Sequence, residues 1–321
     1  MILLLVFSTL IVSGCDASSS PPGNTPPALE VAVSILPQAD FLRRIGGPHV
    51  RTIVLVGPGR SPATFDPTLK QMARLARVRL YYRIGVAFEQ RLVPKIRRTY
   101  PGLRIIDTRR GIALRPMDQV GGNQRSAHQH DHLGTPDPHV WLNPRLVAIQ
   151  ARTICDALKT ADPVNADDYE RNCRVFQADL RAVDARIADL LAPLRGRAFF
   201  VFHPAFGYFA DAYGLRQVAI ETGGKRPTAR QLAALIARAR RERVRLIFVQ
   251  KQFAASSAKA VADAIGGAVV QVDPLAGDYL DNLWHIANEI AKALNRRDTR
   301  GTTVSSRSPA QHGATASLEG D

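Results

Sequence analysis

Short runs of β-branched and apolar residues alternate with amphipathic segments from residue 30 onward. Each run has the length of a strand, and the segments between them repeat their apolar positions every three or four residues, as a helix does. This alternation is typical of βαβ units built around a parallel sheet. The expected strands are 30–35, 52–56, 78–83 and 103–106 in the first half of the chain, and 198–202, 217–220, 246–250 and 268–272 in the second.

The segment 167–194 interrupts the alternation with one continuous helical stripe. Its apolar positions are Tyr169, Cys173, Phe176, Leu180, Val183, Ile187, Leu190 and Leu194. Steps of four and three keep these side chains on one face along the whole segment. At about 1.5 Å per residue the helix is roughly 40 Å long, enough to connect two halves of the molecule. The pattern therefore predicts an α/β protein with two Rossmann-like lobes and parallel sheets, joined by one long rigid helix.

Residues 1–12 are almost entirely apolar, and residues 12–15 (Val-Ser-Gly-Cys) resemble a bacterial lipobox. The run is too short to span a bilayer, which takes about 20 residues of helix, but it has the length of the apolar part of an export signal. We therefore expect Cys15 to carry a lipid anchor, although no Lys or Arg precedes the run. An ordinary N-terminal core segment is the alternative. Asp16 resembles the residue that retains lipoproteins at the inner (cytoplasmic) membrane.

Two further stretches have no apolar periodicity, so neither is expected to pack. The Ser/Pro/Gly-rich segment after Cys15 has the composition of a flexible tether, and the C-terminal tail that of a disordered segment. The expected organisation is 1–15 signal and lipobox, 16–28 tether, 29–165 N-terminal lobe, 166–194 connecting helix, 195–295 C-terminal lobe and 296–321 tail.

The composition supports two hydrophobic cores but does not identify a partner. The chain has 321 residues, of which 45% are hydrophobic, which excludes disorder throughout. Its formal charge of +15, from 43 basic and 28 acidic residues, invites a nucleic-acid hypothesis. The densest basic run, 238–245, lies on an expected helix, where a solvated amphipathic face is the simpler interpretation. We therefore expect no nucleic-acid partner.

Apart from Cys15, the chain contains Cys155 and Cys173, which flank an expected turn between two helices at comparable distances. They lack the CxxC spacing of a metal motif. Antiparallel helices could bring them together, and an exported location permits a disulfide. A disulfide between them is slightly favoured over two buried thiols.

Histidines supply the candidate chemistry, because imidazole is the commonest metal ligand. His128, His130, His132 and His139 lie close together in a polar stretch that ends in a Pro-bounded segment. By itself such a stretch indicates metal affinity and a solvated loop about equally. His203 follows an expected strand at its carboxyl end, where open α/β sheets bind ligands. A buried structural histidine would be an equal alternative if His203 stood alone.

Three motifs occur in a fixed order: DPHVWLNP at 137–144, FHPAFGYF at 202–209 and DPLAGDY at 273–279. Together they resemble the metal-binding solute receptors of ABC importers, specifically the zinc-type members. The resemblance covers about residues 29–294, and it includes the long helix and the lipobox. It implies two small α/β lobes with a metal held in the cleft between them.

Position by position, the resemblance implies that His139, His203 and Asp278 are metal ligands. Manganese-type members typically carry Glu at the position of His203, and imidazole there favours zinc because Mn²⁺ prefers oxygen ligands. The family usually has a further His in an SPHxxxP motif, where this chain has Ala63. A water could fill the vacated position, a nearby histidine could reach it, or zinc could be bound less tightly. The first two together are favoured.

The histidines before His139 match a shortened His-rich insertion of the zinc-type members. The resemblance implies a weak, auxiliary capture role for His128, His130 and His132.

The resemblance implies a non-enzymatic, lipid-anchored periplasmic receptor that delivers Zn²⁺ to an ABC permease and its ATPase for high-affinity import. We expect it to be a monomer. A receptor for another divalent metal such as Mn²⁺, or for a metal chelate, is the alternative. A zinc hydrolase is less favoured: three ligands and an open position suit catalysis, but the sequence contains no HExxH motif and no general base with motif support.

Overall fold

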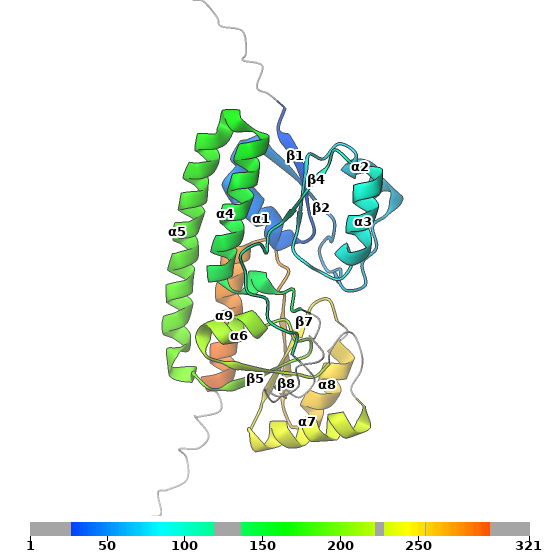
Figure 1. Cartoon of the computed structure of the whole chain (residues 1–321). Coiled ribbons are helices and arrows are strands. Elements are labelled where there is room, and N and C mark those ends of the chain that lie inside the picture. Colours follow the sequence, from blue (N-terminus) through cyan, green and yellow to red (C-terminus); the bar gives the residue numbers. More distant parts are fainter. Residues whose placement is uncertain (1–26, 119–135, 222–227, 254, 296–321) are drawn as a thin grey trace, which may run out of the picture.

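The computed structural model describes residues 27–118, 136–221, 228–253 and 255–295, which form two α/β lobes beside a long pair of helices (Figure 1). Each lobe contains a sheet of four parallel strands with helices packed against it. The predicted fold class, two lobes with parallel sheets joined by a long helix, is confirmed.

The first lobe is built on a sheet of order β2-β1-β3-β4. Its strands are β1 (Leu29–Val33), β2 (Val50–Val54), β3 (Leu80–Arg83) and β4 (Arg104–Asp107). Its helical segments are α1 (Leu36–Gly46), η1 (Gly47–His49), α2 (Leu69–Leu75) and α3 (Glu89–Thr99). The last three residues of the central strand β1 are fully buried. Burial on both faces explains why their sequence is apolar throughout and does not alternate with polar residues.

The second lobe repeats this plan with the order β6-β5-β7-β8. Its strands are β5 (Ala198–Val201), β6 (Arg216–Ala219), β7 (Leu246–Gln250) and β8 (Ala268–Val272). Its helices are α6 (Gly207–Tyr213), α7 (Ala229–Arg241) and α8 (Ala255–Ala264). In both lobes the chain adds its second strand on one side of the first strand and its third strand on the other side. Open parallel sheets bind ligands at such a reversal of strand order, outside the carboxyl ends of the strands.

The remaining helices form the side of the molecule that carries both lobes (Figure 1). They are η2 (Val140–Leu142), α4 (Pro144–Ala161), η3 (Pro163–Asn165), α5 (Ala166–Leu191), η4 (Ala192–Leu194) and α9 (Tyr279–Asn295). The 26 residues of α5 span about 39 Å and run past both lobes. The predicted long helix is thus α5, followed by one 3-10 turn before the second lobe.

A continuous hydrophobic core joins the lobes through these helices. The ring of Phe41 on α1 lies 5.7 Å from that of Phe176 on α5, and 4.9 Å from Tyr279 at the start of α9. A separate cluster, which includes Leu235 and Val261, lies between the second sheet and α7 and α8. Because α9 follows the second lobe yet packs on α1 of the first, the two lobes are held together by buried apolar contacts.

Helix α2 begins after Thr68, and not at the preceding Asp66-Pro67 pair, which also has the residue types of a helix start. Thr68 accepts a hydrogen bond from the backbone N–H of Gln71 (3.2 Å), and the Gln71 side chain accepts one from the N–H of Thr68 (3.0 Å). This reciprocal pair satisfies two backbone donors that a start at Asp66 would leave open. The same arrangement opens α7, where Thr228 and Gln231 form the reciprocal pair.

Cys155 of α4 and Cys173 of α5 are fully buried at the contact between these two helices, as expected of antiparallel helices. Both are free thiols in the structure. The Cys155 thiol is 3.5 Å from the carbonyl oxygen of Tyr169, and the Cys173 thiol is 3.6 Å from that of Ala151. The expected disulfide is not formed here, and a bond between the two after export stays a prediction.

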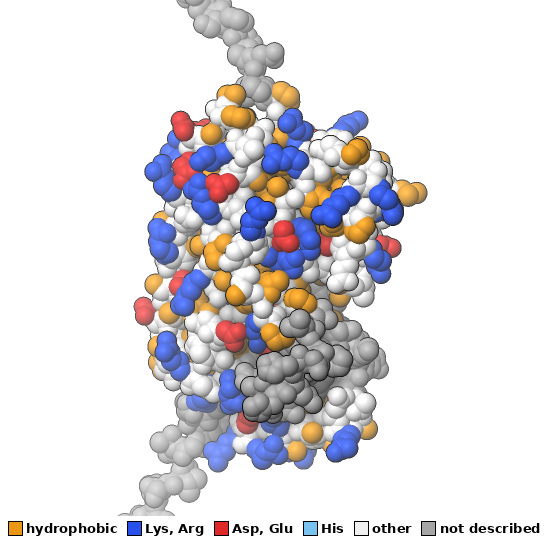
Figure 2. All heavy atoms as spheres, viewed as in Figure 1, with side chains coloured by type: hydrophobic (Ala, Val, Ile, Leu, Met, Phe, Trp, Pro, Cys, Tyr) orange, Lys and Arg blue, Asp and Glu red, His pale blue; other side chains and the backbone are white. Residues whose placement is uncertain are grey.

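Several expectations fall on residues outside the described ranges: Cys15 with the signal, most of the tether, the tail, and His128, His130 and His132. Within the described ranges no helix is long and apolar enough to cross a membrane. On the face shown in Figure 2, Lys and Arg side chains are spread over both lobes, with Asp and Glu between them.

Candidate metal centre

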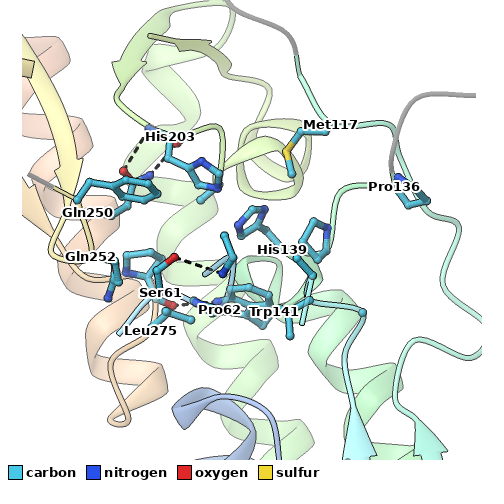
Figure 3. A pocket seen from close by; sticks show the side chains of 18 of the residues that line it. Ser61, Pro62, Met117, Pro136, His139, Trp141, His203, Gln250, Gln252 and Leu275 are labelled. Atoms are coloured by element: carbon cyan, nitrogen blue, oxygen red, sulfur yellow. Dashed lines mark hydrogen bonds between the residues drawn. The ribbon is translucent and has the colours of Figure 1, made fainter. Parts of the chain in front are cut away.

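A cavity of about 280 Å³ lies between the two lobes (Figure 3). Segments that follow strands of both sheets line it, together with the segment leading into η2. Both sheets therefore present their strand ends to one shared cavity, as expected of a ligand site in open parallel sheets. The lining residues are Ser61, Pro62, Ala63, Gly85, Val86, Ala87, Gln90, Met117, Pro136, Pro138, His139, Trp141, His203, Ala205, Gln250, Gln252, Phe253, Pro274 and Leu275.

His139 enters the cavity immediately before η2 and is held by Asp137. Oδ1 of Asp137 accepts a hydrogen bond from the backbone N–H of His139 (3.0 Å) and lies 2.7 Å from its Nδ1. Asp137 is fully buried, and Arg115 donates to its Oδ2 (3.2 Å). Arg115 and Asp137 are adjacent because Pro116 pairs with Pro136 in an antiparallel bridge. This bridge fixes the carboxylate, and the carboxylate fixes the imidazole.

His203 follows β5 and is held by the two neighbouring strands. Oε1 of Glu221, just after β6, lies 2.5 Å from Nδ1 of His203. The side chain of Gln250, at the end of β7, accepts from the backbone N–H of His203 (3.2 Å) and donates to its carbonyl oxygen (2.7 Å). The ring of Phe253 stacks on the imidazole with centroids 5.0 Å apart. The side chain and backbone of His203 are therefore both fixed by the sheet.

Burial of His203 favours the neutral form of its imidazole. Burial lowers the pKa of His203 below the ordinary value of 6.5; the hydrogen bond with Glu221 opposes this fall, and the nearby His139 adds to it. A neutral imidazole has a lone pair available for a metal ion, so burial favours the binding-competent form.

The two imidazoles lie side by side in the cavity, with ring centroids 5.2 Å apart and an interplanar angle of 69° (Figure 3). In both rings Nδ1 is engaged by a buried carboxylate, which leaves Nε2 as the nitrogen available to a ligand. Carboxylates that orient imidazoles in this way are typical of metal sites in proteins. The arrangement therefore supplies two nitrogen ligands for a cation such as zinc.

Comparison with known proteins agrees with this geometry. The sequence matches, over residues 31–293, the family described as "ZnuA: Zinc-uptake complex component A periplasmic". The chain belongs to this family. It is 26% identical over 274 residues to the high-affinity zinc uptake system protein ZnuA of Bacillus subtilis, covering 84% of this chain and 86% of that protein. It is 24% identical over 281 residues to the zinc-binding lipoprotein AdcA of Streptococcus pneumoniae, covering 85% of this chain and 54% of AdcA.

A crystal structure of ZnuA superposes on the chain with a TM-score of 0.76 and 38% sequence identity, covering 83% of this chain and 99% of that one. The two-lobe architecture of the ZnuA family is therefore shared along almost the whole described length.

Of the metal-ligand positions that the family resemblance implies, some lie at the cavity and others do not. His139 and His203 meet in the cavity, and Ala63 lines it as well. Asp278, just before α9, is exposed and does not line the cavity. Among the described residues, no three of His, Cys, Asp and Glu are grouped closely enough to hold a metal ion. Asp278 as a third ligand stays a prediction, as do the three upstream histidines.

Sequence reasoning missed the carboxylates behind both imidazoles. Asp137 stands in the same motif as His139, two residues earlier, so a signal for it existed. Glu221 is different, because it lies 18 positions after His203 and reaches it through the pairing of β5 with β6, where its N–H donates to the carbonyl oxygen of Phe202 (2.9 Å). Only the register of the sheet reveals that contact.

Glu89, for which the sequence offered no motif, shapes one wall of the cavity. Its buried carboxylate accepts hydrogen bonds from Ser34 Oγ (2.5 Å) and from the N–H groups of Ile84 (2.9 Å) and Gly85 (2.7 Å). Burial raises the pKa of Glu89, and these hydrogen bonds partly offset the rise. Glu89 is not among the lining residues, so its role is to fix the loop after β3.

Proposed function

We propose that this chain is an extracytoplasmic receptor that binds Zn²⁺ in the cleft between its lobes and delivers it to an ABC permease and its ATPase. The observation that carries this proposal is the pair of imidazoles, His139 and His203, facing one cavity with each Nδ1 held by a buried carboxylate. Membership of a family described as the periplasmic component of a zinc-uptake complex supports it, as do the names of the zinc-uptake and zinc-binding relatives.

The donor atoms favour zinc over manganese as the cargo. Among the described lining residues, the two candidate ligands are the imidazole nitrogens of His139 and His203. Imidazole suits zinc, whereas Mn²⁺ prefers carboxylate, carbonyl and water oxygens. A hydrolase would also need a general base near the metal-bound water. The described lining residues include no Asp, Glu, Lys or Tyr, which favours a binding role over a catalytic one.

The proposal includes attachment of the receptor to the inner membrane through a lipid on Cys15. Its support is the lipobox-like sequence at residues 12–15 and the lipoprotein AdcA among the relatives. One acyl chain gives marginal membrane binding and two or more give stable binding, so a multiply acylated Cys15 would keep the receptor at the membrane.

Zinc titration of the purified protein tests the proposal. We expect one tight site per chain, lost in His139→Ala and in His203→Ala because each removes one of the two facing imidazoles. His285→Ala is the matched control, since His285 is exposed on α9 and away from the cavity, and it should bind zinc as the parent does. Unchanged affinity in both cleft variants would overturn the proposal.

A further inference from the structure

The described walls of the cavity offer fewer metal ligands than a zinc ion takes. Of the side-chain types that commonly bind zinc, the described lining residues include two, His139 and His203. Zinc sites in proteins usually have four ligands. Ala63 brings only a methyl group to the cavity, and Asp278 lies exposed outside it. Two positions on the ion are left for other donors.

The charge of the ion is also unmatched at the described surface of the cavity. No Asp or Glu is among the described lining residues. Asp137 and Glu221 stand behind the imidazoles, each in contact with Nδ1, so neither carboxylate lines the space that the ion would occupy. Transfer of a doubly charged ion from water into such a site is strongly unfavourable unless anionic groups arrive with it.

The cavity is larger than a single ion requires. Its volume of about 280 Å³ approaches the lower end of small-molecule sites, about 300 Å³. Apolar surfaces of Met117, Trp141 and Phe253 bound this space, and the hydroxyl of Ser61 and the amide of Gln252 line it too (Figure 3). Apolar walls with a few polar groups are typical of sites for small organic ligands.

We propose that the cleft takes zinc together with a small carboxylate chelator, of the size of one amino acid or hydroxy acid. The imidazoles of His139 and His203 hold the ion from the protein side. Carboxylate oxygens and an amine or hydroxyl group of the chelator fill the other positions, and the carboxylate offsets the charge. This proposal rests on the zinc-receptor function and specifies the form in which the ion is bound.

Equilibrium dialysis at fixed total zinc tests it, with L-histidine or citrate as the added chelator. A chelator withdraws zinc from a receptor that binds the bare ion, so retained zinc should then fall. The proposal predicts the opposite sign for at least one of the two compounds: retained zinc rises, and mass spectrometry of the eluted ligand finds one chelator molecule per zinc ion.

Substitutions at Ala63 provide an independent readout. Ala63→His adds a third imidazole at the cavity, so it should bind bare zinc about tenfold more tightly or better and lose its dependence on the chelator. Ala63→Leu fills the space and should abolish retention of the chelator. Thr64→His is the matched control, because Thr64 is the exposed neighbour of Ala63 and does not line the cavity; it should behave as the parent.

The outcomes separate this proposal from the function on which it rests. If the parent retains neither bare zinc nor zinc with a chelator, the receptor function fails. If it retains bare zinc tightly and both chelators only reduce the amount, the receptor function stands and the chelate proposal is overturned. Loss of that bare zinc on triple substitution of His128, His130 and His132 by Ala would then identify the missing donors.

Discussion

The two imidazoles in the cleft are both held through Nδ1 by a carboxylate, but by different structural means. His139 depends on its own segment: Asp137 is two residues away and is fixed by Arg115 across a short antiparallel bridge. His203 depends on a sheet, with Glu221 supplied by the strand on one side and Gln250 by the strand on the other. A local turn and a parallel sheet therefore both leave Nε2 facing the cavity. The orientation of His139 therefore depends mainly on one carboxylate, that of Asp137. The position of His203 depends on two separate strands.

The largest effect is expected at Asp137, because it holds both the backbone and the ring of His139. In Asp137→Asn a neutral amide replaces the carboxylate that orients the His139 ring, so zinc affinity should fall about 100-fold, at the upper end of the range for groups that orient metal ligands. The free energy of unfolding should also fall by about 1–3 kcal/mol. Zinc titration and urea denaturation measure the two effects.

Asp189→Asn is the matched control for this substitution, since Asp189 is exposed on α5. A wild-type zinc affinity in Asp137→Asn would contradict the account of His139.

A smaller effect is expected at Glu221, because Gln250 still holds the backbone of His203 when Glu221 is changed. Glu221→Gln retains an oxygen that can accept from Nδ1, so zinc affinity should fall about tenfold. Its loss of unfolding free energy should be smaller than that of Asp137→Asn. If Glu221→Gln destabilises the protein more, then the sheet does not distribute the support of His203 as the comparison states.

The pH dependence of His203 is the finest test of the comparison. Protons compete with zinc for imidazole, and burial lowers the pKa of His203 from 6.5, so the part of zinc binding that depends on His203 should be lost only below about pH 6.5. The hydrogen bond with Glu221 raises the pKa of His203, so in zinc-free Glu221→Gln the pKa of His203 should be lower than in the parent. NMR titration of the His203 ring in zinc-free protein measures the shift, and a shift to higher pH would contradict it.

The sequence predicts those parts of the molecule that depend on neighbouring residues. The strands of both sheets and the stripe of α5 follow from local periodicity, and the capping box at Thr228 follows from two side chains three residues apart. His139 was recognisable within its motif, and His203 from its place after a strand. Each of these features depends on residues that are close together in the sequence, so the sequence pattern alone predicts it.

The supporting residues could not be predicted in the same way. Glu221 and Gln250 contact His203 only because their strands pair with β5. Glu89 fixes the loop after β3 only because Ser34 and that loop surround its carboxylate. Burying a carboxylate requires several hydrogen bonds from separate elements, and no local pattern records them. Asp278 is exposed and is not among the described lining residues, so its role as a ligand stays a prediction that rests on the motif.

X-ray absorption spectroscopy of the zinc-loaded protein tests the central claim most directly, because it reports the ligands around the ion itself. The account predicts two imidazole nitrogens at about 2.0–2.1 Å from zinc. At a zinc concentration high enough to load the weakened sites, His139→Ala and His203→Ala should each reduce the imidazole contribution by one. A parent spectrum without imidazole ligands, or one that neither substitution alters, would contradict the claim that zinc is held between the lobes by these two histidines.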